Sequence, residues 1–194
     1  MELETYGHHI PNVDMPFLLI FQAFTSIYVV MRVLGIDPGL NVTGYGVLEA
    51  DGDHPKVVEA GVVRSNARKC LAERLNEISR ELNEIIGQFK PQAIAVEELY
   101  SHYTHPITAV IMGHVRGVIF LKAAEAGIPV ESYASTRIKK SLTGNGRATK
   151  QQIQRMVKST LGLPAVPEPP DAADALAIAL CHCRALLHNE TVRA

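Results

Sequence analysis

Four acidic residues lie where predicted strands end or a predicted helix begins, and carboxylates in such places can bind divalent cations. Asp37 and Glu97 each end a short apolar run. Asp171 and Asp174 are three positions apart at the start of an alanine-rich segment, so they share one face of the first helical turn. Mg²⁺ prefers oxygen ligands of this kind. The four acids therefore predict a site for divalent-cation chemistry.

A structural explanation of the helical pair stays open. Aspartate is favoured at helix starts, and a negative side chain there complements the positive end of the helix dipole. Asp171 and Asp174 can therefore serve as capping residues alone. Asp37 and Glu97 weigh against this explanation, because a carboxylate at the end of a buried strand must be hydrogen-bonded, paired or bound to a cation. We favour cation chemistry for the group.

A basic segment precedes the final helix. From Ser132 to Pro167 the sequence has no acidic residue, although the formal net charge of the whole chain is −1. Such a run is either a solvated face or a surface for a polyanion, and its position before the acidic pair favours phosphate. Its basic residues are Arg137, Lys139, Lys140, Arg147, Lys150, Arg155 and Lys158.

Length and cysteine usage are typical of one globular domain in a reducing environment. A chain of 194 residues can bury a sizeable core. Cys70, Cys181 and Cys183 show no framework spacing, so we expect a cytoplasmic protein without disulfides. His182 lies between two of these cysteines, but neighbouring helical positions cannot all face one ion, and a zinc site is disfavoured.

The first 30 residues precede the first well-patterned strand. Their apolar stretch at 17–30 lacks a basic start and is broken by polar residues, so we expect neither a secretory signal nor a membrane span. Met31 directly precedes the strand, so either translation begins there or the preceding segment packs loosely. We expect an extension over 1–30, a folded domain over 31–188 and a tail over 189–194.

Hydrophobic periodicity predicts an α/β fold with a mixed five-stranded sheet flanked by helices. The first three strands form an antiparallel meander, and a helix then crosses over to the strand that carries Glu97. That first helix ends near Gly87. We expect strands at 31–37, 42–49, 56–64, 93–97 and 129–131, and helices at 71–87, 108–126, 136–142, 150–161 and from 171 onward.

Five motifs occur in a fixed order along the chain: Gly-Ile-Asp-Pro-Gly at 35–39, Thr-Gly-Tyr-Gly at 43–46, Glu97, Gly-Asn-Gly-Arg-Ala-Thr-Lys-Gln-Gln at 144–152, and Asp-Ala-Ala-Asp-Ala-Leu-Ala at 171–177. Together they strongly resemble the RuvC family of bacterial Holliday junction resolvases. The opening motif alone also occurs in sugar kinases, whereas the ordered set is specific. The resemblance covers residues 31–187.

The resemblance implies an RNase H-like fold, a homodimer and a cytoplasmic enzyme of recombination, DNA repair and the SOS response. It implies symmetric, metal-dependent nicking of two opposing strands of a four-way DNA junction, with 5′-phosphate and 3′-hydroxyl ends. It also implies a partnership with the RuvA–RuvB branch-migration complex and no membrane association.

By position, Asp37, Glu97, Asp171 and Asp174 match the catalytic, metal-binding carboxylates of that family. The resemblance implies two Mg²⁺ ions in each active site, with Mn²⁺ able to substitute. One ion would activate water and the other would stabilise the leaving 3′ oxygen. Without metal, carboxylates so close together raise one another's pKa values.

DNA contacts are implied by the same resemblance. Lys139 and Lys150 match positions near the scissile phosphate, and Arg147 and Lys140 extend this basic track or are solvated helix residues. Tyr100 matches an aromatic position that stacks on an unpaired base at the junction centre, or it packs on the neighbouring helix.

The segment after this tyrosine departs from the family. Residues 101–106 (Ser-His-Tyr-Thr-His-Pro) stand where a loop containing Lys-Asn is expected. For His102 and His105 we favour solvation over a role at phosphate or metal. The helix at 108–126 has an apolar face that forms part of the core and, by resemblance, a dimer seam.

Three other functions share features of this sequence. Actin-like ATPases and sugar kinases share the Gly-Ile-Asp strand, but they need two domains and a second phosphate loop. A junction-binding scaffold without catalysis is disfavoured because all four carboxylates are present. A nuclease of the YqgF type shares the opening motif but fits the late acidic pair less well.

Overall fold

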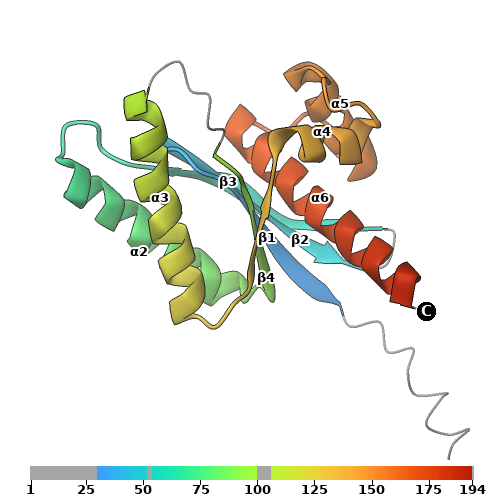
Figure 1. The fold of residues 1–194 in the computed structure, drawn as a ribbon, viewed down its shortest axis with the longest axis horizontal. Coiled ribbons are helices and arrows are strands. Elements are labelled where there is room, and N and C mark those ends of the chain that lie inside the picture. Colours follow the sequence, from blue (N-terminus) through green and yellow to red (C-terminus); the bar gives the residue numbers. More distant parts are fainter. Residues whose placement is uncertain (1–29, 52–53, 100–105, 194) are drawn as a thin grey trace, which may run out of the picture.

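A computed structural model describes residues 30–51, 54–99 and 106–193. These residues form a twisted five-stranded sheet with helices on both faces (Figure 1). The α/β fold and the mixed sheet predicted from the sequence are confirmed. Of the expected N-terminal extension, only Val30 is among the described residues, and the rest lies outside them.

The sheet has the order β3-β2-β1-β4-β5. The first three strands are antiparallel, as the meander predicts, and β1, β4 and β5 run parallel to one another. This arrangement places β1 beside β4 in the middle of the sheet. The strands are β1 (Met31–Asp37), β2 (Val42–Ala50), β3 (Lys56–Arg64), β4 (Ala93–Glu97) and β5 (Val130–Tyr133).

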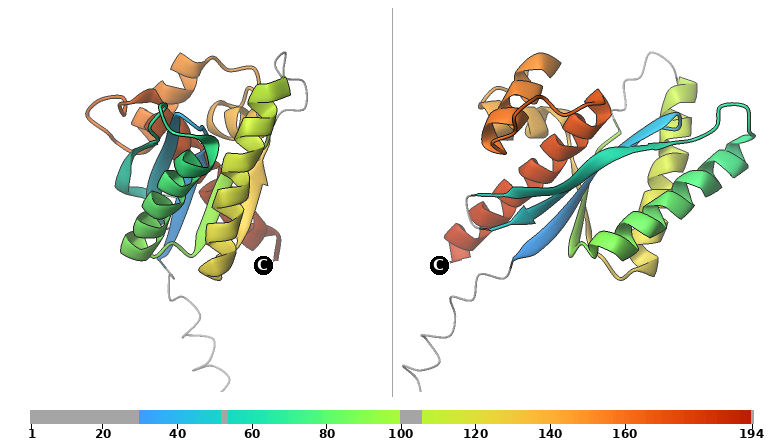
Figure 2. Two further views of the ribbon diagram at one scale, coloured as in Figure 1. Left: turned by 90° about the vertical axis from the view of Figure 1, so that its left-hand side faces the viewer. Right: turned by 180° about the vertical axis from the view of Figure 1, so that it is seen from behind.

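Two groups of helices cover the sheet. One face carries α2 and α3, and the other carries α6 with the shorter α4 and α5 packed beside it (Figure 2). The helix α6 extends past position 188, where the sequence predicts the domain to end. The helices are α2 (Leu71–Phe89), α3 (Pro106–Glu125), α4 (Ser135–Thr143), α5 (Lys150–Thr160) and α6 (Pro170–Arg193).

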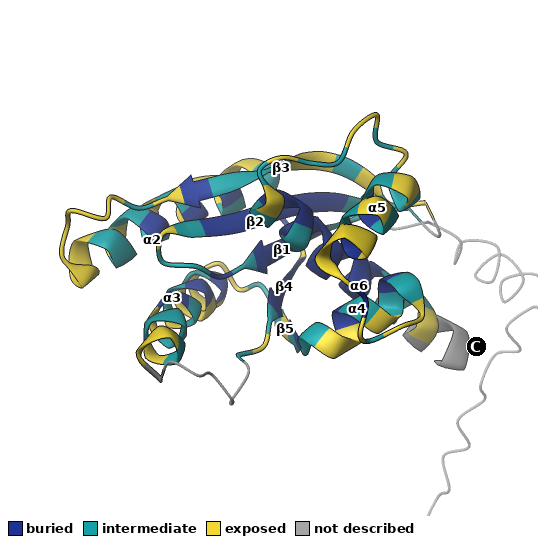
Figure 3. Ribbon diagram, turned by 90° about the horizontal axis from the view of Figure 1, so that it is seen from above, coloured by how far each residue is buried: buried dark blue, intermediate teal, exposed yellow. Residues whose placement is uncertain are grey.

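Alternation along the strands divides the core into two layers. On β1, Leu34 and Ile36 face α2 and α3, whereas Val33 faces α4, α5 and α6. The helix α6 is buried along much of its length, so it forms the central cover of its face (Figure 3). Within that layer the Tyr133 hydroxyl and His182 Nδ1 form a hydrogen bond of 2.7 Å.

The end of α2 differs from the prediction. The sequence placed the end of this helix near Gly87, and the helix continues through Gly87 to Phe89. Lys90 then adopts the left-handed conformation with φ 48°, and its N–H donates to the carbonyl of Ile86. A glycine is therefore not required at this helix end, because a lysine takes the left-handed position.

The helix α3 is apolar on more than one side. Val115, Ile119 and Ala123 are buried against the sheet layer, whereas Val110 and Leu121 are exposed. Among the described residues, α3 is the one helix long and apolar enough to cross a membrane by length and composition. Its packing against α2 and the burial of one side instead indicate a helix of the domain core, with a second apolar face exposed.

Candidate active site

Two of the four predicted carboxylates are placed by the central strands. Ile36 on β1 lies opposite Val96 on the parallel strand β4. The next residue of each strand, Asp37 and Glu97, therefore leaves the sheet at the same edge. Both side chains are partly exposed there, in contrast to the fully buried residues that precede them.

The other two carboxylates are brought to this edge by the close approach of α6. A Cβ on Gly44 would overlap the carbonyl oxygen of Asp171, and one on Gly35 would overlap that of Ala175. Gly44 is the residue that pairs with Asp37 across the β1–β2 ladder. Because these two glycines have no side chain, the first turns of α6 rest directly on the strands, and Asp171 and Asp174 lie near Asp37.

The electrostatics of Asp37 show that the four carboxylates act on one another. Burial and the nearby negative charges of Glu97, Asp174 and Asp171 together raise the pKa of Asp37 from 3.8 to about 7, with burial the largest cause. Lys150 opposes this shift. A site with this much negative charge favours a bound cation.

Lys150 supplies one cation from the chain itself. Its Nζ lies 2.6 Å from Oδ2 of Asp174, and this hydrogen bond raises the pKa of the Lys150 ammonium. The position of the lysine is set by the start of α5, where the Thr149 side chain accepts a hydrogen bond from the N–H of Gln152 in a capping box. The cap thus holds Lys150 in the first turn, facing α6.

A small cavity of about 190 Å³ brings acidic and basic candidates together. Glu97 and Asp174 line it, and so do Lys139 and Lys150. The structure therefore unites side chains from β4, α4, α5 and α6 that lie far apart in the sequence. Lys140 and Arg147 are exposed and do not line this cavity.

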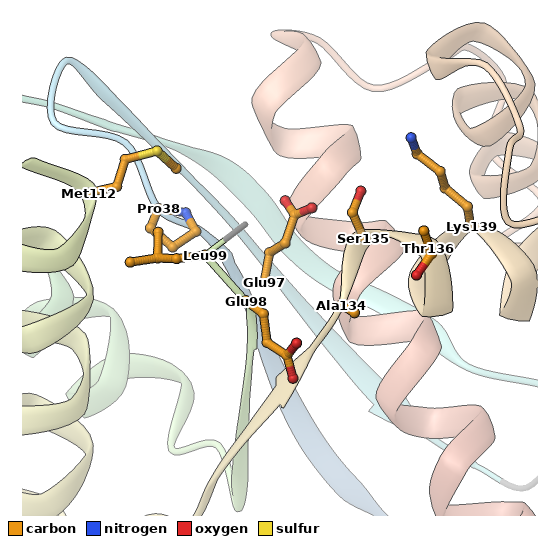
Figure 4. Close-up of a pocket in the computed structure, with 9 residues that line it drawn as sticks. All are labelled: Pro38, Glu97, Glu98, Leu99, Met112, Ala134, Ser135, Thr136 and Lys139. Carbon is orange, nitrogen blue, oxygen red and sulfur yellow. The ribbon is translucent and has the colours of Figure 1, made fainter. Parts of the chain in front are cut away.

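A larger adjoining cavity of about 380 Å³ also includes Glu97 and Lys139 (Figure 4). The carboxylates of Glu97 and Glu98 point in different directions, and that of Glu97 is turned toward α6. Ser135 and Thr136 add hydroxyl groups to the lining, and Leu99 and Met112 add apolar surface. Sequence analysis missed these residues because none belongs to a motif with recognisable spacing.

The four carboxylates are ligands of the type that a divalent cation needs, although they are not arranged around a single point. In the described part of the chain, no three His, Cys, Asp or Glu side chains are placed so that they could hold a metal ion together. The ammonium group of Lys150 instead holds Asp174. The all-carboxylate composition and the raised pKa of Asp37 nevertheless fit a hard divalent cation.

Three sequence candidates cannot be placed in this site. Tyr100, His102 and His105 lie outside the described residues, so their predicted interactions remain expectations.

Comparison with known proteins decides the family. The sequence model of the family described as "Crossover junction endodeoxyribonuclease RuvC" matches residues 33–182. The chain belongs to the RuvC family. The matched range includes all four carboxylates and the basic segment, and it leaves out the first 32 residues.

Relatives in this family cover most of the chain. The RuvC of Rhodopirellula baltica is 54% identical over 149 residues, which are 77% of this chain and 84% of that protein. The RuvC of Alkaliphilus oremlandii is 44% identical over 152 residues, or 78% of this chain and 92% of that protein. Both are named crossover junction endodeoxyribonucleases.

Solved structures agree with the family assignment. Thermus thermophilus RuvC, determined in complex with a Holliday junction substrate, matches with a TM-score of 0.78 and 36% identity, covering 82% of this chain and 96% of that one. The yeast mitochondrial resolvase Ydc2 has a TM-score of 0.57 at 18% identity and covers 89% of each chain, which shows likeness of fold alone. The RNase H-like fold expected from the sequence is confirmed.

Proposed function

We propose that this protein is a metal-dependent endodeoxyribonuclease that resolves four-way DNA junctions. Family membership supports the class of activity, since RuvC relatives are named for it. The observation that carries the proposal is the carboxylate group at the sheet edge, where three acidic neighbours and burial raise the pKa of Asp37 to about 7. Carboxylates buried so close together repel one another, and a bound cation would offset that repulsion.

Asp37, Glu97, Asp171 and Asp174 would hold the metal, with two Mg²⁺ ions as the proposed cofactor and Mn²⁺ as a substitute. When bound, the ions would activate a water molecule and stabilise the leaving 3′ oxygen, giving 5′-phosphate and 3′-hydroxyl ends. The central strands fix the direction in which the carboxylates of Asp37 and Glu97 leave the sheet. Asp171 and Asp174 at the start of α6 complete the group of four carboxylates.

The lysines of the small cavity would neutralise the phosphate. Lys139 lines the same cavity as Glu97, and Lys150 is already paired with an acid of the site. An ammonium group binds phosphate without reading sequence. Lys150 would therefore pair with Asp174 in the metal-free protein and with the DNA phosphate when metal and DNA are bound. Lys140 and Arg147 would extend the contact to flanking phosphates, and Tyr100 would stack on an unpaired base.

Paired cuts in opposing strands require two sites, which a homodimer would supply. The exposed side chains of Ile107, Val110 and Leu121 on α3 form an apolar face that a second copy would cover. Two copies related by a twofold axis would present equivalent sites to the two opposing strands. We propose that the enzyme works in the cytoplasm with the RuvA–RuvB branch-migration complex.

Cleavage of a synthetic four-way junction tests the proposal. The labelled junction is incubated with the protein and Mg²⁺, beside a lane with EDTA and lanes with Asp37→Asn and Asp51→Asn. The second substitution removes a carboxylate that pairs with Lys56, outside the site. We expect paired nicks that DNA ligase can seal, lost with EDTA and with Asp37→Asn and kept with Asp51→Asn. Binding without any cut would contradict the catalytic assignment and favour a scaffold.

A further inference from the structure

Arg116 joins the middle of α3 to the end of the strand that carries Glu97. Its Nη1 donates a hydrogen bond to the main-chain carbonyl of Glu97. Its Nη2 donates to the Oγ of Ser132 on β5, at 3.2 Å. One guanidinium group therefore bridges two neighbouring strands at the edge where the proposed site lies.

The chemistry of this contact favours a positioning role. A guanidinium group has its donors in a rigid planar fork, and its bonds to a carbonyl are strengthened by its charge. The carbonyl it holds belongs to the peptide between Glu97 and Glu98, whose side chains point in different directions. The N–H of the same peptide, that of Glu98, donates to the carbonyl of Tyr133 at 2.9 Å, so α3 and β5 together hold the peptide next to the Glu97 side chain.

The same guanidinium group also contacts the outer part of α3. Its central carbon lies 5.2 Å from the centre of the Phe120 ring, in a cation–π arrangement. Phe120 is 39% exposed, so Arg116 is in contact with a residue at the surface of the helix as well as with the sheet edge. This contact lies within α3, and the hydrogen bond from Arg116 to the Glu97 carbonyl links the position of the helix to that of Glu97.

We propose that Arg116 is a positioning residue, which holds the Glu97 peptide so that the Glu97 carboxylate is directed to the proposed metal site. The inference rests on the proposed nuclease function. Arg116 acts through Glu97 and need not touch DNA or metal itself. Outer residues that orient metal-binding groups typically contribute about 10- to 100-fold in metal affinity or activity.

Two substitutions separate positioning from packing. Arg116→Met keeps an unbranched apolar stem over Phe120 but removes every donor. Arg116→Lys keeps the charge and one donor nitrogen but lacks the planar fork whose two nitrogens reach Glu97 and Ser132 separately. Ser132→Ala removes the second acceptor alone. Each variant is examined for Mg²⁺ binding by calorimetry without DNA, for single-turnover cleavage of the junction, and for junction affinity in Ca²⁺.

We expect Arg116→Met to weaken Mg²⁺ binding and to slow cleavage by about 10- to 100-fold, with junction affinity unchanged. Arg116→Lys should recover part of both losses, and Ser132→Ala should cause a smaller loss in the same direction. If Arg116→Met lowers the melting temperature but leaves Mg²⁺ binding and cleavage as in the wild type, the role is structural and the inference is wrong.

Two further outcomes are distinguishable from that one. If Arg116→Met does not fold, Arg116→Lys and Ser132→Ala still decide, because unchanged Mg²⁺ binding and cleavage in both would overturn the inference. If the wild-type protein binds Mg²⁺ but cuts no junction, the nuclease proposal fails, and an Arg116→Met protein with weakened Mg²⁺ binding would still support positioning of Glu97.

Discussion

Asp37 is the residue of the proposed site whose pKa is raised most by burial and neighbouring charge. It ends a buried strand, and burial, the largest cause, together with the other three carboxylates raises its pKa to about 7. Because its pKa in an unfolded chain is near 3.8, folding favours the protonated form. The contribution of Asp37 to the free energy of unfolding is therefore fully present below about pH 4 and is lost as the pH rises through 7.

The first prediction is therefore a pH-dependent stability of the metal-free protein. In EDTA, we expect the free energy of unfolding to contain a component that falls between pH 4 and 7, measured by urea denaturation at a series of pH values. Asp37→Asn should remove this component, whereas Asp51→Asn should leave it in place. A wild-type profile that matches that of Asp37→Asn would contradict the electrostatic description of the site.

A second prediction concerns Lys150, whose ammonium group occupies an oxygen of Asp174 in the metal-free protein. Lys150→Met should bind Mg²⁺ more tightly without DNA, because the ion no longer competes with the ammonium group. The same variant should cleave the junction more slowly, by at least about 10-fold, since a charge near the phosphate is lost. Calorimetry and single-turnover cleavage measure the two effects.

Lys139→Met serves as the matched control for that experiment. Lys139 lines the same cavity but is in none of the ion pairs found among the described residues. Its substitution should slow cleavage without tightening Mg²⁺ binding. Equal Mg²⁺ affinities in the two variants would rule out competition by Lys150.

Individual residues differ in how far the sequence predicts them. The acids could be found because a charge at the end of an apolar run is unusual. The ion pair between Lys150 and Asp174 could not be predicted, because the sequence assigned Lys150 to phosphate and Asp174 to metal. Arg116 could not be found either, because it belongs to no motif and its spacing from Lys122, the other Lys or Arg residue of α3, carries no signal.

At the scale of elements, the approach of α6 to the sheet decides whether the site forms. The helix reaches the strands because Gly35 and Gly44 leave room for its backbone, and the Leu176 side chain packs 2.8 Å from the position that a Cβ on Gly46 would occupy. These glycines belong to the motifs that resemble the family. Their structural role is close packing of helix on strand.

The third prediction tests this packing. Gly44→Ala should destabilise the protein by about 1–3 kcal/mol through overpacking and should reduce cleavage beyond that loss, because Asp171 is pushed away from the other acids. Gly87→Ala is the control, since Gly87 lies in an open helical position and alanine there should stabilise by about 0.5–1 kcal/mol. Urea denaturation and single-turnover cleavage of folded protein report the two effects, and full cleavage by Gly44→Ala would contradict the packing argument.

The positions of the strands and helices could largely be predicted from the sequence. The contacts between these elements could not. The strand at 56–64 is found as predicted, since its β-branched residues are bounded by turn signals. The end of α2 was expected near Gly87 and lies at Phe89, because Lys90 takes the left-handed position after the helix. Periodicity showed that α3 is apolar but could not show which of its sides meets the sheet, since apolar residues occur around the helix.

For the molecule as a whole, the exposed side of α3 is the surface to explain. Ile107 is 75% exposed and Leu121 is 56% exposed, on a helix whose other side is in the core. A dimer would cover these residues. That residues 1–30 form an extension and 31–188 the folded domain stays a prediction.

The fourth prediction concerns this surface. Leu121→Glu should shift the protein to monomers in sedimentation velocity, because a charge is placed in an apolar contact. The monomer should nick single strands without the paired cuts that resolve a junction. Leu71→Glu on α2, where the side chain is 38% exposed, should leave the assembly unchanged. A dimer that survives the Leu121 substitution would place the seam elsewhere.

Three of the four carboxylates come from the first and last elements of the described domain, with Asp37 on the first strand and Asp171 and Asp174 at the start of the last helix. A growing chain on the ribosome therefore lacks part of the proposed metal site until α6 has been made and has docked across the first strand. The proposed nuclease activity would therefore begin only after the last helix has been made and has docked, so an incomplete chain would not cut DNA.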